Sequence, residues 1–140
     1  MESLRKHIRD IPGFPKEGIV FRDITPLIGD YAAFEEAVDE LAAPFESKEV
    51  DLVLGIESRG FIFGGAVALT LGAGFLPARK PGKLPAETVA AHYELEYGTD
   101  SIELHSDAVT KGQRVLIVDD LMATGGTAAA AVELVEKLGG

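Results

Sequence analysis

The sequence predicts an α/β domain built around a mainly parallel β-sheet. Val115–Val118 is an uninterrupted aliphatic run without polar alternation, which is typical of a strand that is buried on both faces. Val50–Ile56 is predicted as a second buried strand. Each strand is followed by a polar turn and then by a helical pattern rich in glycine and alanine. This order favours parallel strands joined by helices, and residues 1–140 are expected to form a single domain.

The composition excludes several classes of function. Acidic residues outnumber basic ones by 23 to 13, which gives a formal net charge of -10. A surface of this sign disfavours nonspecific binding of nucleic acid or of anionic membranes. The chain has no cysteine, which excludes disulfides and thiol catalysis, and it has neither an apolar signal core nor a run long enough to span a membrane. We therefore expect a cytoplasmic protein.

The N-terminal part is expected to begin with a short helix that Ser3 caps and that Pro12 and Gly13 end. Ile19–Pro26 carries charged residues between apolar ones and ends in proline, so we expect an irregular extended segment rather than a core strand. Asp30 is in position to cap the next helix. The apolar residues of that helix are spaced three and four positions apart and predict one buried face: Phe34, Ala37, Val38, Leu41 and Phe45.

The middle of the chain continues the strand and helix pattern. Phe61–Leu69 is predicted as a helix, and Gly74–Arg79 as a third short strand. Residues 84–104 contain alternating stretches and a return strand at Ser101–Leu104. We expect this segment to form a mobile hairpin.

The stretch after Val115–Val118 carries the strongest functional signal. Asp119 and Asp120 come at the carboxyl end of the strand, where open α/β sheets bind their ligands. A Thr-Gly-Gly-Thr turn, residues 124–127, follows before Ala128 is expected to begin a helix. Glycines let the backbone approach a ligand closely, and the amides at a helix N-terminus favour a phosphate. Two adjacent carboxylates need donors nearby, such as sugar hydroxyls or a hydrated divalent ion.

A ribose 5-phosphate satisfies both requirements, because its hydroxyls suit the acids and its phosphate suits the glycine turn. A nucleoside-triphosphate P-loop is excluded since no Gly-Lys-Ser/Thr is present, and no GxGxxG opens the first strand-to-helix turn. A single aspartate or glycine would more often only cap or break a turn, but the complete string in this order favours a ribose phosphate site.

Two further loops are expected at the same edge of the sheet. Glu57-Ser58-Arg59-Gly60 follows the second buried strand and precedes a helix, as the first loop does. Arg79, Lys80 and Lys83 follow the third strand, and this cluster of bases would suit a diphosphate. The alternatives are a capping acid with a surface base in the first of these loops, and a solvated surface patch in the second.

The string Val115–Thr127 closely resembles the phosphoribosyl-diphosphate motif of the type I phosphoribosyltransferases, and with the other segments the resemblance narrows to the adenine phosphoribosyltransferases. It covers the chain from about Gly13 to its end. It implies the family's mainly parallel sheet, a hood over the base at residues 1–29 and a catalytic flap hairpin at residues 80–104. The family's usual C-terminal strand has no counterpart, since the sequence ends in a helix cap at residues 137–140. We therefore expect a chain truncated at the C-terminus.

The resemblance also implies roles for individual residues. It implicates three residues in catalysis, an acid of the flap that handles the purine ring proton and two bases: Glu96, Arg59 and Lys83. It implies contacts with the base, the diphosphate, the ribose and the 5-phosphate for a larger set: Val20, Phe21, Arg22, Glu57, Ser58, Arg79, Asp119, Asp120, Leu121, Ala123, Thr124, Gly125, Gly126 and Thr127. A cis peptide bond between Glu57 and Ser58 is implied as well. Glu94 is the alternative to Glu96 in the flap.

The implied activity is transfer of the 5-phosphoribosyl group from 5-phosphoribosyl 1-diphosphate to adenine, giving AMP and diphosphate in purine salvage. Mg²⁺ is the implied cofactor, held mainly by substrate and water near Asp119 and Asp120 and not directly by the protein. The implied assembly is a homodimer that binds neither nucleic acid nor membranes. Two alternatives stay open: the same chemistry on xanthine or hypoxanthine, and a domain that senses the donor without turnover.

Truncation would change the edge of the sheet. In a doubly wound sheet of order 3-2-1-4-5, loss of the last strand would leave Val115–Val118 at an edge. An aliphatic edge strand with unpaired amides invites pairing with another chain. We therefore expect a partner chain or a rearranged segment to cover this strand.

Overall fold

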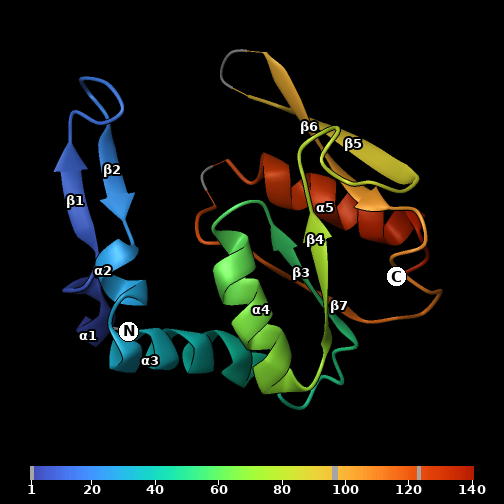
Figure 1. The fold of residues 1–140 in the computed structure, drawn as a ribbon, viewed down its shortest axis with the longest axis horizontal. Helices are drawn as coiled ribbons and strands as arrows, with labels where there is room; N and C mark the ends of the chain where they lie inside the picture. Colours follow the sequence, from blue (N-terminus) through green and yellow to red (C-terminus); the bar gives the residue numbers. More distant parts are fainter. Residues whose placement is uncertain (1, 96–97, 123) are drawn as a thin grey trace. The chain divides into compact units, whose positions relative to one another are not determined.

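The computed structural model describes residues 2–95, 98–122 and 124–140 of the chain. The chain divides into two compact units, Met1–Pro44 and Phe45–Gly140, which are described separately. Figure 1 shows the helices and strands of both units. Among the described residues, every helix is too short or too polar to cross a membrane.

The first unit contains an antiparallel strand pair and helices. Its elements are α1 (Glu2–Arg5), β1 (Arg9–Pro12), β2 (Val20–Asp23), α2 (Thr25–Ile28) and α3 (Tyr31–Ala42). Arg9 pairs with Asp23, and Pro12 pairs with Val20. The prediction of a helix as far as Pro12 is therefore wrong beyond Arg5, because the backbone extends to pair with β2. The same pairing makes part of the expected irregular segment a regular strand.

Of the two helix caps predicted in this unit, one is wrong and the other is confirmed. Ser3 lies inside α1 and does not cap it, since its hydroxyl donates to Glu36 Oε1 at 2.7 Å. Asp30 caps α3 as predicted, with its carboxylate accepting from the Ala33 N–H at 2.9 Å.

The buried face of α3 consists mostly of small residues: Ala33, Ala37, Val38 and Ala42. Leu41 is 39% exposed, contrary to the prediction, and Phe45 belongs to the following 3-10 turn η1 (Ala43–Phe45). The helix is thus turned about its axis relative to the expectation. The short helices α1 and α2 contact α3. The spacing of apolar residues in α3 alone does not show which of its faces these two helices will cover.

The second unit combines a three-stranded parallel sheet of order β4-β3-β7 with an antiparallel hairpin (Figure 1). Its elements are β3 (Leu52–Ile56), α4 (Gly60–Leu71), β4 (Gly74–Ala78), β5 (Thr88–Glu94), β6 (Thr99–His105), β7 (Val115–Val118) and α5 (Gly126–Lys137). The parallel sheet and the flap hairpin expected from the sequence are both present. The hairpin β5–β6 is longer on its return strand than expected, and Arg79 and Glu103 exchange backbone hydrogen bonds that join it to the end of β4.

Helices cover both faces of the sheet. Phe75 on β4 points to α4, because it lies against Gly64 of that helix. The opposite face packs against α5 and the hairpin and forms the main core of the unit (Figure 1). Its largest fully buried side chains include Leu54 on β3, Ile102 and Leu104 on β6, and Leu134 on α5.

Strand β7 lies at one edge of the sheet, as expected from the doubly wound order, and within the described ranges it pairs only with β3. Its residues Val115, Leu116 and Ile117 are half-buried, and Val118 is buried. The prediction of a strand buried on both faces was therefore wrong for most of β7. The central strand β3 fits that description better, because it has a neighbour on each side.

Candidate active site

The carboxyl ends of β3, β4 and β7 lie at nearly the same level, at one edge of the sheet that we call the carboxyl edge. Ile56 pairs with Ala78, and Gly55 pairs with Val118. The loops that follow therefore start side by side: residues 57–60, 79–83 and 119–125.

Glu57 connects the first loop to the second. Its Oε1 accepts hydrogen bonds from Arg79 Nε at 3.0 Å and from the Lys80 backbone N–H at 3.1 Å. Burial alone would raise the pKa of this carboxyl, but the two hydrogen bonds and the nearby charge of Lys83 outweigh burial and hold the pKa of Glu57 below its ordinary value. Glu57 is thus a charged group that positions Arg79.

The peptide bond between Glu57 and Ser58 is cis, as the family resemblance implied. Ser58 is exposed, and its carbonyl accepts a hydrogen bond from the Phe61 N–H at 3.2 Å. Helix α4 begins at Gly60, directly after this loop. The loop therefore leads into a helix N-terminus at the carboxyl edge.

Arg79 lies over the ring of Phe61, which in turn contacts the ring of Phe75. Its guanidinium carbon lies 5.9 Å from the Phe61 ring centroid, and Phe61 meets Phe75 edge to face at 5.9 Å and 89°. Phe75 in turn fills space that two glycines leave. A Cβ at Gly55 would lie 2.7 Å from the Phe75 ring, and a Cβ at Gly64 would lie 2.9 Å from it. The sheet and helix thus support the guanidinium from beneath.

Asp119 and Asp120 occupy different environments although they are adjacent. Arg59 Nε lies 2.9 Å from Asp120 Oδ2, so Asp120 is held in an ion pair. The Asp120 N–H donates to Asp119 Oδ1 at 2.8 Å. Burial raises the pKa of Asp119 to about 6, and the Asp120 side chain adds to this effect, whereas the hydrogen bond from the Asp120 N–H and the charge of Arg59 oppose it. Asp119 is therefore the acid that a nearby cation or hydroxyl donor would most help to ionise.

Asp119→Asn is expected to stabilise the folded protein above neutral pH. The folded pKa of about 6 lies above the ordinary value of 3.8, so ionisation of Asp119 costs stability that is lost progressively as pH rises from 4 to 6 and stays lost above that range. After allowance for water around this partly buried group, we expect a gain of about 1 kcal/mol at pH 8. Thermal unfolding at pH 8 and pH 4 measures it, and a gain at pH 4 equal to that at pH 8 would contradict the assignment.

The loops at residues 57–60 and 119–125 approach each other closely at Gly60. A Cβ on Gly60 would lie 3.0 Å from the Val118 carbonyl oxygen and 3.1 Å from Asp119 Oδ1. Both distances are shorter than an ordinary van der Waals contact. The absence of a side chain at Gly60 therefore permits the spacing between Arg59 and Asp120.

The glycine turn leads into α5 earlier than expected. The helix begins at Gly126, so Gly126 and Thr127 belong to its first turn, and Ala128 does not begin it. Gly125 caps the helix with φ 86°, a left-handed conformation that glycine adopts without a steric penalty. Thr124 Oγ1 accepts a hydrogen bond from the Gly126 N–H at 3.3 Å. These are features of a helix N-terminus that can bind a phosphate.

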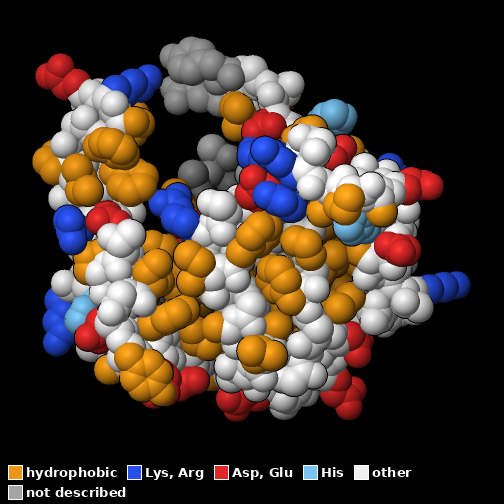
Figure 2. All heavy atoms as spheres, in the orientation of Figure 1, with side chains coloured by type: hydrophobic (Ala, Val, Ile, Leu, Met, Phe, Trp, Pro, Cys, Tyr) orange, Lys and Arg blue, Asp and Glu red, His pale blue; other side chains and the backbone are white. Residues whose placement is uncertain are grey.

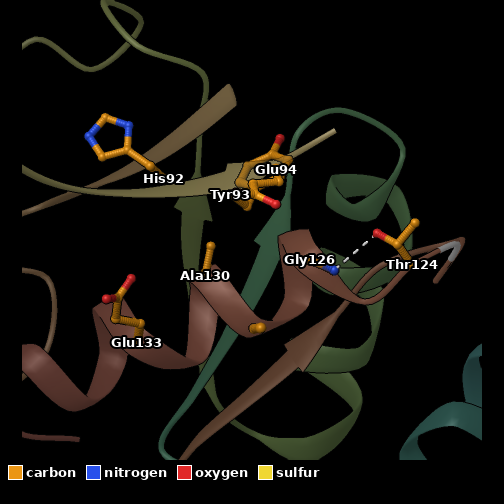
Figure 3. A pocket seen from close by; sticks show the side chains of 8 residues that line it. His92, Tyr93, Glu94, Thr124, Gly126, Ala130 and Glu133 are labelled. Atoms are coloured by element: carbon orange, nitrogen blue, oxygen red, sulfur yellow. Dashed lines mark hydrogen bonds between the residues drawn. The ribbon is translucent and has the colours of Figure 1, made fainter. Parts of the chain in front are cut away.

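A pocket of about 510 Å³ lies between β5 and the N-terminal half of α5 (Figure 3). It is lined by His92, Tyr93, Glu94, Thr124, Gly126, Ala129, Ala130 and Glu133. Figure 3 shows that its residues come from the hairpin on one side and from the glycine turn and α5 on the other. A ligand at the glycine turn would therefore lie beside the hairpin.

Val20, Phe21 and Arg22, the predicted base-contacting residues, lie together on β2 in the first unit. Val20 is 49% exposed, and Phe21 meets Phe14 edge to face at 5.2 Å and 77°. Arg22 forms an ion pair with Asp10 on β1. The contact of this group with a base stays a prediction.

The remaining predicted residues divide into two groups. Lys83 and Leu121 are exposed in the loops after β4 and β7. Glu96 and Ala123 lie outside the described residues, and their roles stay predictions. Glu94 is exposed near the end of β5.

The sequence did not point to three residues that contact the site's charged groups: Phe61, Tyr93 and Asp100. Phe61 lies next to the 57–60 loop, but its contact with Arg79 depends on the pairing of β3 with β4. Tyr93 and Asp100 both bond Lys80, which is a long-range contact in sequence. In the sequence, only the position of Tyr93 and Asp100 in the predicted hairpin could have indicated a role for them.

The carboxyl edge offers few protein ligands for a metal ion. Across residues 2–95, 98–122 and 124–140, no three His, Asp or Glu side chains are grouped so that they could hold one. Asp119 and Asp120 supply carboxylate oxygens, of which Asp120 already pairs with Arg59. Mg²⁺ prefers an octahedron of oxygens and keeps several waters. These residues fit an ion that is held by substrate and water, with the two carboxylates accepting hydrogen bonds from its waters.

Comparison with known proteins identifies close relatives. A family model described as a phosphoribosyl transferase domain matches residues 28–140. An adenine phosphoribosyltransferase of Thermoanaerobacter sp. (strain X514) is 58% identical over 140 residues, covering 100% of this chain and 81% of the relative. An adenine phosphoribosyltransferase of Chlorobaculum tepidum is 60% identical over 139 residues, covering 98% of this chain and 78% of the relative.

Solved structures agree with this relationship. The adenine phosphoribosyltransferase of Thermoanaerobacter pseudethanolicus has a TM-score of 0.95 at 57% identity, over 99% of this chain and 81% of that one. The enzyme of Saccharomyces cerevisiae, solved with an imino-altritol bisphosphate and adenine, has a TM-score of 0.91 at 46% identity, over 98% and 80% of the two chains. Because the likeness extends over almost the whole sequence and fold, the carboxyl-edge loops included, the chain belongs to the adenine phosphoribosyltransferase family.

Proposed function

We propose that the chain transfers the 5-phosphoribosyl group of 5-phosphoribosyl 1-diphosphate to N9 of adenine, producing AMP and diphosphate for purine salvage. The observation that carries this proposal is the identity of 58% and 60% to adenine phosphoribosyltransferases over essentially the whole chain. Relatives from Saccharomyces cerevisiae and Giardia lamblia were solved with adenine and with 9-deazaadenine. These ligands favour adenine over hypoxanthine or xanthine as the acceptor.

The donor would bind along the loop after β7. In this proposal, Asp119 and Asp120 bind the ribose hydroxyls, and the 5-phosphate lies against the amides at residues 124–127. The left-handed Gly125 and the N-terminus of α5 support the second assignment, since exposed N–H groups and the helix dipole favour an anion. The raised pKa of Asp119 supports the first, because hydroxyl donors would compensate for its burial.

The leaving diphosphate would lie against the loops at residues 57–60 and 79–83. Arg79, Lys83 and Arg59 would provide positive charge, and the backbone of Glu57 and Ser58 would provide hydrogen-bond donors. The bond from ribose C1 to the diphosphate oxygen breaks ahead of attack in the proposed reaction, so charge moves onto the diphosphate while the ribose becomes an oxocarbenium ion. Catalysis then depends mainly on positioning and on electrostatic stabilisation of the leaving group.

Mg²⁺ is the proposed cofactor, and when bound it would neutralise part of the leaving group's charge. Asp119 and Asp120 would orient its waters rather than coordinate it directly. The chemistry of the two side chains supports this arrangement, because Mg²⁺ keeps several waters and carboxylates can accept hydrogen bonds from them.

In this proposal, residues of β2 in the first unit bind the adenine base. Val20 is 49% exposed, and in this proposal its backbone would offer hydrogen bonds to the purine edge, while Phe21 would stack on the ring with Arg22 beside it. The ring of Phe14 supports this role, because its edge-to-face contact holds Phe21 in one orientation. Glu96 would handle the proton of the purine ring.

A nucleotide-forming assay with separate purines tests the proposal. Protein, Mg²⁺ and donor are mixed with adenine, hypoxanthine or xanthine, and nucleotide is measured by chromatography. We expect nucleotide from adenine alone. Nucleotide from another purine would assign a different acceptor, and donor binding without nucleotide from any purine would assign a sensing domain instead.

Glu96→Gln is expected to lower kcat by about 100-fold with little change in donor affinity, because general acid and base groups contribute on this scale. Glu94→Gln is the matched control, since Glu94 is exposed on β5 and removes the same charge. Initial rates at varied donor concentration separate kcat from KM. A damaging Glu94→Gln with a silent Glu96→Gln would show that the flap acid is Glu94.

We also propose that the protein works as a homodimer in the cytoplasm. The lack of cysteine supports a reducing compartment, and the exposed apolar side chains Phe14 and Tyr31 of the first unit, 51% and 77% exposed, support an interface there. Light scattering coupled to gel filtration measures the assembly, and a monomer at micromolar concentration would contradict it.

A further inference from the structure

Lys80 differs from the neighbouring bases Arg79 and Lys83 in where its side chain binds. Its Nζ donates hydrogen bonds to the Tyr93 hydroxyl at 3.0 Å and to the Asp100 carboxylate. The Tyr93 hydroxyl donates to Asp100 Oδ2 at 3.4 Å. Lys80 thus connects the turn after β4 with both strands of the hairpin.

Tyr93 and Asp100 lie close to the turn that joins the two strands of the hairpin. They pair directly across β5 and β6, one position before the last pair, Glu94 and Thr99. The Leu95 N–H then donates to the Gly98 carbonyl at 2.9 Å and closes the turn. In the sequence, Glu96 falls between Leu95 and Gly98. The bonds to Lys80 are therefore made at the end of the hairpin that carries the proposed proton-handling acid.

The charges of this contact are complementary and partly shielded. The side chains of Lys80 and Asp100 are 40% and 31% exposed, and the ammonium lies 5.6 Å from the Tyr93 ring centroid. Burial alone would lower the pKa of Lys80, but Asp100 and Tyr93 raise it, and the bond from Lys80 lowers the pKa of Asp100. Both groups are therefore charged throughout the neutral range. Figure 2 shows basic and acidic side chains gathered where the hairpin meets the end of β4.

We propose that Asp100 and Tyr93 are positioning residues that hold the end of the hairpin, through Lys80, against the turn that carries Arg79 and Lys83. This inference rests on the proposed function, because one side of the contact carries the diphosphate-binding bases and the other carries Glu96. In the proposed reaction, a hairpin held in this place would shield the ribose carbon from water, since the pocket lies beside the hairpin. When the contact is broken, the hairpin opens more often, and water competes with adenine for the oxocarbenium ion.

Asp100→Asn keeps the shape of the side chain but removes its charge. It is expected to lower kcat for AMP formation about 10-fold, with less than about a 2-fold change in the donor KM. It should also increase hydrolysis of the donor, in which water attacks ribose C1 and diphosphate leaves, giving ribose 5-phosphate. Both products are measured in one reaction by chromatography. A residue that only stabilised the fold would not change the division between transfer and hydrolysis.

Further variants isolate the contact. Tyr93→Phe removes only the hydroxyl and should give the same change in smaller measure. Lys80→Met should match Asp100→Asn, whereas Lys80→Arg keeps a cation and should restore most of kcat. Asp107→Asn is the charge-matched control, because Asp107 is exposed in the turn after β6, and we expect it to leave kcat and hydrolysis unchanged.

Hydrogen exchange provides a readout that does not need turnover. The Leu95 amide reports on closure of the hairpin end, and it should exchange faster in Asp100→Asn than in the wild type, while amides of the core strand β3 keep their protection. If Asp100→Asn does not fold, the same measurements are made on Tyr93→Phe.

Equal kcat, equal hydrolysis and equal Leu95 exchange in wild type and Asp100→Asn would overturn the inference. A wild type that forms no nucleotide from any purine would contradict the proposed function instead. In that case, hydrogen exchange of the Leu95 amide alone tests the hairpin contact. Faster exchange in Asp100→Asn would support the contact, and unchanged exchange would overturn it.

Discussion

A double variant with Asp119→Asn and Asp120→Asn is expected to fold normally and to form AMP at least about 1000-fold more slowly than the wild type. Asparagine keeps the size of each side chain but removes the charges proposed to fix the ribose hydroxyls and the waters of Mg²⁺. The asparagine oxygen at position 119 can still accept the hydrogen bond from the next N–H. Arg59 loses its ion pair, but its side chain is 38% exposed and can be hydrated.

The double variant is measured by initial rates and by thermal unfolding at pH 8. A control with Asp107→Asn and Glu136→Gln removes two exposed acids of the same unit and thus makes the same change in net charge. We expect the control to keep wild-type rates. A double variant with rates within tenfold of the wild type would place the ribose site elsewhere, and an equally slow control would attribute the loss to net charge.

Gly60→Ala is expected to lower kcat/KM about 100-fold although a methyl group at this position has no proposed contact with a ligand. The new Cβ would lie 3.0 Å from the Val118 carbonyl oxygen and 3.1 Å from Asp119 Oδ1. To relieve these contacts, either the start of α4 or the end of β7 must shift by a few tenths of an ångström. Because Arg59 directly precedes Gly60, such a shift separates it from Asp120. We also expect a loss of about 1–2 kcal/mol of stability.

Gly65→Ala is the matched control on the same helix, because a Cβ at Gly65 would meet nothing within 4 Å. It should leave kcat/KM unchanged and raise stability by up to about 1 kcal/mol, since alanine favours a helix more than glycine does. Steady-state kinetics and urea unfolding of both variants separate the two effects. Equal kinetics in the two variants would show that the approach of α4 to β7 is unimportant for activity.

The fold of the second unit was largely predictable because its signals are local. Val115–Val118 and Val50–Ile56 identified two of the parallel strands, and the acids and glycines after them indicated the carboxyl edge. The prediction of full burial was wrong for β7. Its residues are apolar, which favours the core, but the strand lies at the edge of the sheet and is therefore partly exposed. The start of α5 was also misplaced, since Gly126 seemed part of the turn and yet belongs to the helix.

The first unit and the finer contacts of the site were harder to predict for a different reason. Arg9–Pro12 becomes a strand only because β2 pairs with it, and no local pattern indicates this. Lys80 was grouped with Arg79 and Lys83 by its position, but its partners are Tyr93 and Asp100 on the hairpin. Contacts between residues far apart in sequence depend on register, which a single sequence does not specify.

The contact of Arg79 with Phe61, and of Phe61 with Phe75, has a consequence for protein engineering. Replacing a helical glycine by alanine is a common route to higher stability, worth up to about 1 kcal/mol. At Gly64 the added methyl group would clash with the Phe75 ring. If Phe75 moved, Phe61, which contacts it, would move as well, and so would Arg79, which lies over Phe61. A Gly64→Ala substitution chosen for helix propensity alone would therefore disturb the ring under Arg79 and, in the proposed function, reduce affinity for the donor. Among homologous sequences, the residues at positions 55, 64 and 75 should accordingly change together rather than singly.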